Sequence, residues 1–273
     1  MIASREYVIK RLVELITHPK KKYSHNFLTN YDVVKKAVDA IKCDNPVIEI
    51  GPGLGALTEE IIKRGFELTA YEIDEVMCSH LRETFQKYSN FTLVEGDFLK
   101  QKISSNQKIT VISNVPYQIT TPIIEKVLTS NIDVDSFIFM LQKEAAMRIQ
   151  AKIGSKDYAP LPIFLSYLGK FETVCKVGRE SFIPSPNVDS IIIKFEITRE
   201  RDYLFEKNLY QLLYNSFRMR RKTLVNNLQT YFKCKEDLIK VFNNINISLT
   251  ARPEELKIED YINLLNEINK FKL

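Results

Sequence analysis

The sequence predicts an α/β protein with a doubly wound, mostly parallel sheet, followed by a small all-helical C-terminal domain. Between about residues 30 and 150, short apolar runs alternate with amphipathic helical segments, which is the pattern of a parallel sheet with helices on both faces. A glycine-rich turn, Gly51-Pro52-Gly53-Leu54-Gly55, connects the first apolar run to a helix. From Asp202 onward only helical patterns remain.

The length and composition are those of a globular protein with room for one core domain and a smaller appendage. The chain has 273 residues, of which 45% are hydrophobic and 27% charged. It contains no run of about 18 apolar residues, so we expect no membrane-spanning helix. The segment Met1–Thr17 mixes charged with apolar residues, which predicts a helix and not a signal peptide.

The cysteines and histidines are not arranged as metal ligands. Neither residue type forms a pair at ligand spacing, so we expect no metal, free thiols and a reducing cytoplasmic location. The residues concerned are Cys43, Cys78, Cys175, Cys234, His18, His25 and His80.

The elements can be placed along the chain from the hydrophobic pattern. Strands are predicted at Val47–Ile50, Leu68–Tyr71, Phe91–Glu95, Ile109–Ser113 and Ser136–Leu141, with a further antiparallel pair at Thr173–Val177 and Asp189–Phe195. Helices are predicted at 32–41, 57–62, 75–86, 122–127 and 142–148, and then at 204–217, 222–231, 235–242 and 258–271. We expect three parts: an N-terminal helical extension (1–22), a core domain (23–200) and a helical domain (201–273).

The glycine turn and the tip of the second strand predict a nucleoside site. In doubly wound sheets, ligands bind at the carboxyl ends of the strands near the point where strand order reverses. The glycine spacing after Glu49 departs from the dinucleotide fingerprint, and a glycine turn by itself also fits a nucleoside or tight packing alone. Glu72 could accept both hydroxyls of a ribose, or could be a solvent-facing carboxylate in a turn.

Two further strand ends carry residues suited to an adenine base. Asp97 could accept a hydrogen bond from the amine of a cofactor adenine, with Phe98 or a nearby apolar residue beside the ring, although Asp is also common in turns. In Asn114-Val115-Pro116-Tyr117, the Asn side-chain oxygen and a backbone carbonyl could bind an exocyclic amine while Tyr117 stacks on the base. The same tetrapeptide is also ordinary turn chemistry.

Two features lie outside this set of strand ends. Pro184 and Pro186 stiffen a loop that could hold Phe182 over a pocket, or Phe182 could be buried beneath the loop. The net charge of +5 and the cluster Arg218, Arg220, Arg221 and Lys222 favour a phosphate-binding surface on the helical domain, although such clusters also occur on purely solvated faces.

Taken together, the motifs resemble those of the S-adenosylmethionine-dependent ribosomal RNA adenine N6-dimethyltransferases, and within them the bacterial enzymes of the small subunit. The resemblance extends from about Lys20 to Ile268. The matching stretches are Asn26-Phe27-Leu28, 49–58, Glu72-Ile73-Asp74, Gly96-Asp97, Asn114-Val115-Pro116-Tyr117, 141–144, Gly154-Ser155-Lys156, 182–190, Arg220-Arg221-Lys222-Thr223-Leu224 and 252–256.

The resemblance implies a Rossmann-like methyltransferase fold, the cofactor S-adenosyl-L-methionine and the N6,N6-dimethylation of two adjacent adenosines in the 3′-terminal hairpin of 16S rRNA. The partner would be the small (30S) ribosomal subunit, and the enzyme a monomer. Implied cofactor-binding residues are Asn26, Leu28, Gly51, Gly53, Glu72, Ile73, Asp97, Phe98 and Asn114. Implied catalytic residues are Asn114, Pro116, Tyr117 and Phe182, of which Tyr117 and Phe182 would sandwich the adenine. Implied RNA-binding residues are Lys156, Arg218, Arg220, Arg221 and Lys222.

The chain departs from the family pattern at Ser24-His25, where Gly-Gln is usual, and at Gln118, where Asn is usual. Three rival functions stay open at this level. They are dimethylation of large-subunit rRNA, as in macrolide resistance, a non-catalytic ribosome assembly factor on the same fold, and a DNA adenine methyltransferase.

Overall fold

The computed structural model describes residues 1–20, 25–42, 44–116, 119–130, 132–232 and 234–271. The chain forms two compact units. The first comprises Met1–Ala146 and Phe171–Ile197, and the second comprises Met147–Lys170 and Thr198–Leu273. The division into three domains made from the sequence stays a prediction. In the described part of the chain, no helix is long and apolar enough to cross a membrane.

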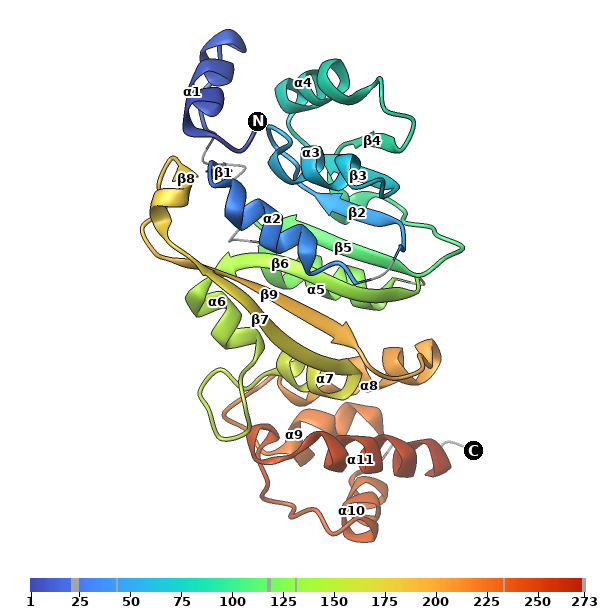
Figure 1. Ribbon diagram of the computed structural model, residues 1–273. Helices are drawn as coiled ribbons and strands as arrows, with labels where there is room; N and C mark the ends of the chain where they lie inside the picture. Colours follow the sequence, from blue (N-terminus) through green and yellow to red (C-terminus); the bar gives the residue numbers. More distant parts are fainter. Residues whose placement is uncertain (21–24, 43, 117–118, 131, 233, 272–273) are drawn as a thin grey trace. The chain divides into compact units, whose positions relative to one another are not determined.

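The first unit is built on a seven-stranded sheet (Figure 1). Its strand order is β4-β3-β2-β5-β6-β9-β7. Strands β2 to β6 run parallel to one another, and β9 runs antiparallel to β6. The bounds are β2 Val47–Ile50, β3 Leu68–Glu72, β4 Phe91–Glu95, β5 Ile109–Asn114, β6 Val134–Gln142, β7 Gly169–Val177 and β9 Ser190–Ile197. The predicted doubly wound, mostly parallel sheet is confirmed.

The strand order reverses between β2 and β5. Chain order runs outward from β2 through β3 to β4 on one side, and from β5 to β6 on the other. Right-handed crossovers therefore place the connecting helices of the two halves on opposite faces of the sheet. The helices of this part are α1 Arg5–Glu14, α2 Tyr31–Asp39, α3 Ala56–Lys63, α4 Glu75–Phe85, α5 Thr120–Thr129 and α6 Lys143–Ile149. The carboxyl ends of β2 and β5 thus form the switch point at which a ligand is expected.

The central strands form the core of the first unit. All four residues of β2 are buried, and so are the first five of β5, because both faces of the sheet are covered. The rings of Phe137, Phe139 and Phe195 stack where β6 meets β9, with centroids 4.7 and 4.9 Å from that of Phe137. The sheet is therefore a rigid base for the residues at its strand ends.

The second unit is helical. Its helices are α7 Pro160–Leu168, α8 Tyr203–Ser216, α9 Leu224–Leu228, α10 Lys235–Asn244 and α11 Ile258–Phe271. The prediction missed α7, although Pro160 at its first turn is a helix-start signal. The predicted helix 222–231 is wrong in extent, because α9 ends at Leu228 and a 3₁₀ helix, Gln229–Tyr231, follows it.

A two-stranded sheet, β1 (Phe27–Leu28) with β8 (Phe182–Ile183), was also not predicted. The strands are antiparallel, with Phe27 opposite Ile183 and Leu28 opposite Phe182. Ser181 strengthens the pairing, since its carbonyl accepts hydrogen bonds from the backbone N–H of Thr29 (2.8 Å) and from the Thr29 hydroxyl (3.0 Å). The proline loop is thereby joined to the segment that leads into α2.

Candidate cofactor and active site

A cavity of about 300 Å³ lies at the carboxyl ends of the parallel strands in the first unit. This volume is at the lower end of the range usual for small-molecule sites. Every residue predicted to bind the cofactor lines it except Phe98, and Pro116 lines it as well. The predicted residues on its wall are Asn26, Leu28, Gly51, Gly53, Glu72, Ile73, Asp97 and Asn114. One wall thus combines residues from four different strand ends and from the segment before α2.

The glycine turn is tied to the tip of β3. Gly53 has a φ of 58°, a left-handed conformation that favours glycine. A Cβ atom at this position would lie 3.2 Å from the ring of Phe27, so the turn and β1 approach closely. The Gly53 N–H donates to Oε2 of Glu72 at 3.0 Å. The turn and the acidic residue are therefore one structural unit.

Glu72 is a buried carboxylate held by backbone donors. Its Oε1 accepts hydrogen bonds from the N–H groups of Ile73 (2.8 Å) and Asp74 (2.9 Å). Burial raises the pKa of Glu72, although the three backbone N–H groups oppose the rise. Oε2 accepts only the Gly53 N–H and has a second lone pair, so the group can still accept a hydrogen bond from a ligand's hydroxyl.

Glu49 is a second carboxylate on the cavity wall and was not among the predicted site residues. It is 1% exposed and accepts a hydrogen bond of 2.6 Å from the Thr58 hydroxyl. Burial raises the pKa of Glu49 to about 8; the hydrogen bond from Thr58 opposes this rise and the nearby Glu72 adds to it. The cavity therefore contains a carboxyl whose charge changes near neutral pH. The sequence feature that could have indicated this role for Glu49 is its position two residues before the first glycine of the turn.

The segment before α2 is fastened to the start of α4. Nζ of Lys20 lies 2.9 and 2.8 Å from the two oxygens of Asp74, which also caps α4 by accepting from Val76 N–H at 3.0 Å. Burial acts to raise the pKa of Asp74, but Lys20 and the capping bond outweigh it and the pKa lies below its ordinary value. His25 lines the cavity, with Nε2 3.9 Å from Asp74, and burial lowers the pKa of its ring. His25, one of the residues at which the chain departs from the family pattern, thus lies within the site.

Asn114 is oriented by the same segment. Its Nδ2 donates a hydrogen bond of 2.9 Å to the carbonyl of Asn26. Because the amide nitrogen faces Asn26, the amide oxygen points the other way and is available as an acceptor. The carbonyl of Pro116, the other predicted acceptor, receives the N–H of Ile119 at 3.1 Å and keeps a second lone pair. Tyr117 and Gln118 lie outside the described residues.

Phe182 is buried and lies off the cavity. From its sequence context, this ring could be held over the pocket or buried beneath the loop, and the resemblance implied that it stacks on the adenine. Instead Phe182 is 1% exposed, lies opposite Leu28 in the β1–β8 pair and belongs to the hydrophobic core. It does not line the cavity. Stacking on a base would require β8 to separate from β1, because the strand pairing turns this ring inward.

Phe98 also points away from the cavity, and Leu99 lines the wall in its place. Phe98 is 5% exposed and contacts Tyr71 edge-on, with ring centroids 5.2 Å apart. Nζ of Lys126, on α5, donates to the carbonyls of Leu99 (2.8 Å) and Gln101 (2.7 Å). Asp97 accepts the Leu99 N–H at 3.0 Å. Lys126 therefore fixes the loop that carries Asp97, which the sequence could not show.

The predicted RNA-binding cations lie in the second unit, on an exposed loop between α8 and α9. Among the residues that the structure describes, no ion pair involves Arg218, Arg220, Arg221 or Lys222. The side chain of Asn227 holds this loop: it accepts from Met219 N–H at 2.8 Å and donates to the Met219 carbonyl at 3.2 Å.

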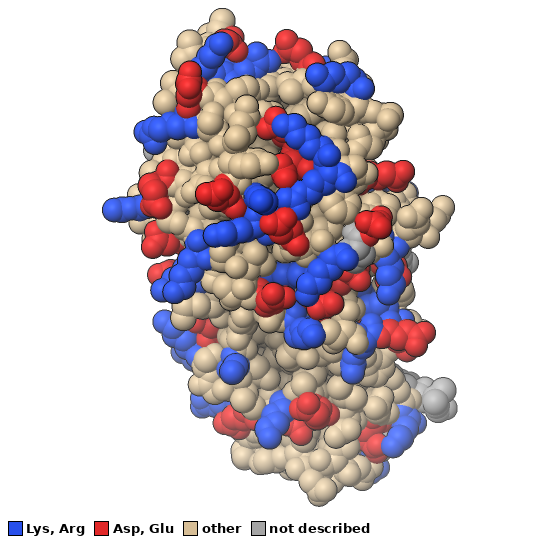
Figure 2. Space-filling view, viewed as in Figure 1, with Lys and Arg blue, Asp and Glu red and all other residues tan. Residues whose placement is uncertain are grey.

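Lys156, the fifth predicted cation, is exposed in the loop before α7. Tyr158 of that loop contacts Phe217, with ring centroids 6.4 Å apart, so the two cationic loops meet within the second unit. On the face drawn in Figure 2, lysines and arginines are interspersed with acidic residues. The net charge is therefore not gathered into one patch on that face.

The first residues of the chain complete the cavity. Ile2 and Val8 line it, although the sequence of Met1–Thr17 predicted only a helical extension. No local pattern in the sequence could have shown this, because the contact depends on where α1 packs.

The family model described as ribosomal RNA adenine dimethylase matches residues 16–270. Two relatives are both called ribosomal RNA small subunit methyltransferase A. The one from Staphylococcus haemolyticus is 35% identical over 92% of this chain and 90% of that protein, and the one from Bacillus mycoides is 38% identical over 93% and 92%.

Solved structures agree with this match. A dimethyladenosine transferase from Plasmodium falciparum superimposes with a TM-score of 0.75 at 27% identity, covering 90% of this chain and 98% of that one. The 23S rRNA methyltransferase ErmE superimposes with a TM-score of 0.64 at 23% identity, covering 89% and 100%. The second likeness shows the fold alone.

Proposed function

The chain belongs to the ribosomal RNA adenine dimethylase family, and we propose that it dimethylates N6 of two adjacent adenosines in the 3′-terminal hairpin of 16S rRNA. It is an rRNA adenine dimethyltransferase, and S-adenosylmethionine is its methyl donor. The observation that carries the proposal is the single cavity on which the glycine turn, Glu72, Asp97 and Asn114 converge.

The residues at successive strand ends fit successive parts of the cofactor. Glu72 at the tip of β3 would accept the ribose hydroxyls, and Asp97 after β4 would accept the adenine amine. Asn26, Gly51 and Gly53 would surround the methionine part, with Leu28 and Ile73 as apolar walls. Leu99 takes the place beside the adenine ring that the sequence suggested for Phe98, because Leu99 and not Phe98 lines the cavity.

Asn114 would hold the acceptor base. When bound, S-adenosylmethionine supplies a methyl group on a positively charged sulfur. The Asn114 oxygen and the Pro116 carbonyl would accept the two hydrogens of the adenosine amine, which aims its lone pair at the methyl carbon, and Tyr117 would stack on the base. Methyl transfer would form the C–N bond and break the C–S bond, so that S-adenosylhomocysteine would be the leaving group and the amine proton would pass to solvent. Positioning supplies most of the rate enhancement, so no strong base is needed.

The small subunit is the proposed substrate because the relatives that are 35% and 38% identical are both named for it. The likeness to the 23S rRNA methyltransferase is weaker, at 23% identity. The exposed cations Arg218, Arg220, Arg221, Lys222 and Lys156 would contact rRNA phosphates and position the protein without reading sequence. We further propose a cytoplasmic monomer that acts in ribosome biogenesis.

The test is transfer of labelled methyl groups from S-adenosylmethionine to unmethylated small subunits. Naked 16S rRNA, large subunits and duplex DNA serve as parallel substrates. Dimethyladenosine in the 3′-terminal hairpin of the small subunit supports the proposal. Labelling of large subunits alone would contradict the substrate. Tight binding to small subunits without any transfer would favour a non-catalytic assembly factor.

A further inference from the structure

The first fifteen residues form a wall of the cavity that the family model does not include. The match to the family begins at residue 16. Ile2 and Val8 nevertheless line the cavity together with Gly53, Leu54 and Asn26. This part of the site is therefore supplied by a segment that precedes the common domain.

The segment is built into the first unit at both of its ends. The Ile2 N–H donates a hydrogen bond of 2.8 Å to the Glu59 carboxylate at the start of α3, and Ser4 forms a β-bridge with Asn30. On α1 the side chains of Val8 and Leu12 are 1% and 8% exposed. The wall is thus a packed element and not a loose terminus.

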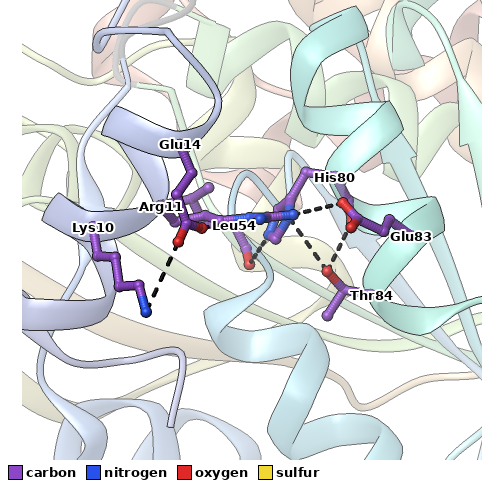
Figure 3. A network of polar contacts seen from close by, with 7 residues as sticks. All are labelled: Lys10, Arg11, Glu14, Leu54, His80, Glu83 and Thr84. Carbon is purple, nitrogen blue, oxygen red and sulfur yellow. Dashed lines mark hydrogen bonds and ion pairs between the residues drawn. The ribbon is translucent and has the colours of Figure 1, made fainter.

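Arg11 joins α1 to α4 through His80 (Figure 3). Nε of Arg11 donates to Nδ1 of His80 at 3.0 Å. Its two terminal nitrogens pair with Glu83 (2.6 Å) and Glu14 (3.1 Å). His80 is 1% exposed, so the ring has one well-defined set of neighbours.

The contact with Arg11 determines which ring nitrogen carries the proton. Because Nδ1 accepts a hydrogen bond, the hydrogen of the neutral ring resides on Nε2. Nε2 lies 3.2 Å from the carbonyl of Leu54 and donates to it. Thr84 does not compete as a donor, since its hydroxyl donates to the His80 carbonyl at 2.8 Å.

Leu54 lies between Gly53 and Gly55, and it lines the cavity. A chain of contacts therefore runs from Arg11 through His80 to the backbone of the glycine turn. We propose that Met1–Leu15 is a wall of the cofactor site and that Arg11 is a positioning residue, which orients the glycine turn through His80. The proposal rests on the proposed function, because it takes S-adenosylmethionine as the occupant of the cavity.

The test compares Arg11→Met with Lys10→Met in the full chain. Both variants remove one positive charge from α1, but the Lys10 side chain is 74% exposed and lies 3.8 Å from Glu14. Binding of S-adenosylmethionine is measured by calorimetry in the absence of RNA. We expect the Kd to rise about tenfold in Arg11→Met, the effect of one lost hydrogen bond in a buried network, and to stay unchanged in Lys10→Met.

A second readout follows the ring of His80 by ¹⁵N NMR. The wild type should show an unprotonated Nδ1 and a protonated Nε2, and Arg11→Met should show a mixture of the two tautomers. Equal Kd values for wild type and Arg11→Met, or equal losses in both variants, would overturn the proposal. If the wild type itself failed to bind S-adenosylmethionine, the proposed function would fail with it.

A matched pair on the apolar side of α1 covers the case in which Arg11→Met does not fold. Val8→Ala removes two methyl groups from the cavity wall, whereas Ile9→Ala changes a residue that is 49% exposed. We expect weaker S-adenosylmethionine binding only in Val8→Ala. Unchanged binding in that variant would overturn the assignment of α1 as a wall of the site.

Discussion

Nδ2 of Asn114 donates a hydrogen bond of 2.9 Å to the backbone carbonyl of Asn26, across 88 residues of chain. The bond joins the end of β5 to the segment before α2, and both residues line the cavity. It leaves the amide oxygen of Asn114 as the acceptor for an incoming amine. One side chain therefore links the cofactor wall to the position proposed for the target base.

Replacing Asn114 by Ala should reduce catalysis much more than cofactor binding. We expect kcat for methyl transfer to fall by about 10²–10³-fold, the usual cost of removing a positioned hydrogen-bonding group that acts in the transition state. The Kd for S-adenosylmethionine should change only a few-fold. Asn90→Ala is the control, because Asn90 also bonds to backbone carbonyls, those of Ile62 and Phe66. A kcat equal to that of the wild type would contradict the role of Asn114.

Glu49 should make folding stability depend on pH. Its pKa is about 8 in the folded protein, above the ordinary 4.5, so the folded state binds this proton more tightly than the unfolded state does. The free energy of unfolding should therefore fall as pH rises from about 5 to about 8, by up to about 1.4 kcal/mol per pH unit, and level off above that range.

Urea unfolding of the wild type and of Glu49→Gln at several pH values checks this. The Gln variant keeps the shape of the side chain but has no proton to lose, so its curve should be flatter across this window. Parallel curves for the two proteins would show that another group is responsible.

Gly55 should tolerate alanine far less than Gly65 does. Both have positive φ, 87° and 86°, so alanine strains the backbone at either position. A Cβ atom at Gly55 would lie 2.6 Å from the Phe85 ring, whereas a Cβ atom at Gly65 would meet no other atom within 4 Å. We expect Gly65→Ala to cost about 1 kcal/mol in the free energy of unfolding and Gly55→Ala about 2–4 kcal/mol. Denaturant unfolding gives both values, and similar losses would refute the steric contribution.

Lys126→Met should weaken cofactor binding from a distance. The substitution leaves the carbonyls of Leu99 and Gln101 without the two bonds that Lys126 donates. We expect the Kd for S-adenosylmethionine to rise about fivefold and backbone amides near Asp97 to exchange hydrogen faster. Lys102→Met is the control, because Lys102 is exposed in the same loop. Identical exchange in wild type and Lys126→Met would contradict the prediction.

Asn227→Ala should impair substrate binding while leaving the chemical step intact. Without its side chain the Met219 N–H loses its acceptor and the Met219 carbonyl keeps only the N–H of Lys222, so the cationic loop is held less firmly in one shape. We expect KM for small subunits to rise about fivefold to tenfold at constant salt, with kcat unchanged. Asn226→Ala, at the exposed neighbouring position, should behave as wild type. A lower kcat with unchanged KM would place the effect elsewhere.

The parallel sheet and most of the cavity wall were predictable because they depend on local patterns. The bounds of β2 and β4 agree with the apolar runs from which they were predicted. Glu72 and Asn114 end β3 and β5, Asp97 follows β4, and the carboxyl ends of parallel strands meet at one edge of a sheet. Their meeting on one cavity therefore follows from strand order alone.

What was missed depends on tertiary packing. The sequence left open whether Phe182 faces the pocket or is buried beneath the loop, and only the pairing of two residues of β8 with β1 turns its ring inward. Phe98 and Leu99 are neighbours of similar apolarity, and only the 3₁₀ turn after Asp97 determines which of them faces the cavity. The roles of Arg11 and Lys126 arise from contacts between helices that are distant in sequence.

The β1–β8 pairing also determines when the site can be assembled during protein synthesis. Strands β2 to β6 are complete once the ribosome has passed Gln142, so the parallel sheet can form early. Phe27 and Leu28 acquire their strand partners only after Phe182 and Ile183 have been made. The wall that Asn26 and Leu28 contribute to the cavity is therefore completed late in translation, and a nascent chain that ends before residue 182 would have the parallel strands β2 to β6 without a fixed cofactor site.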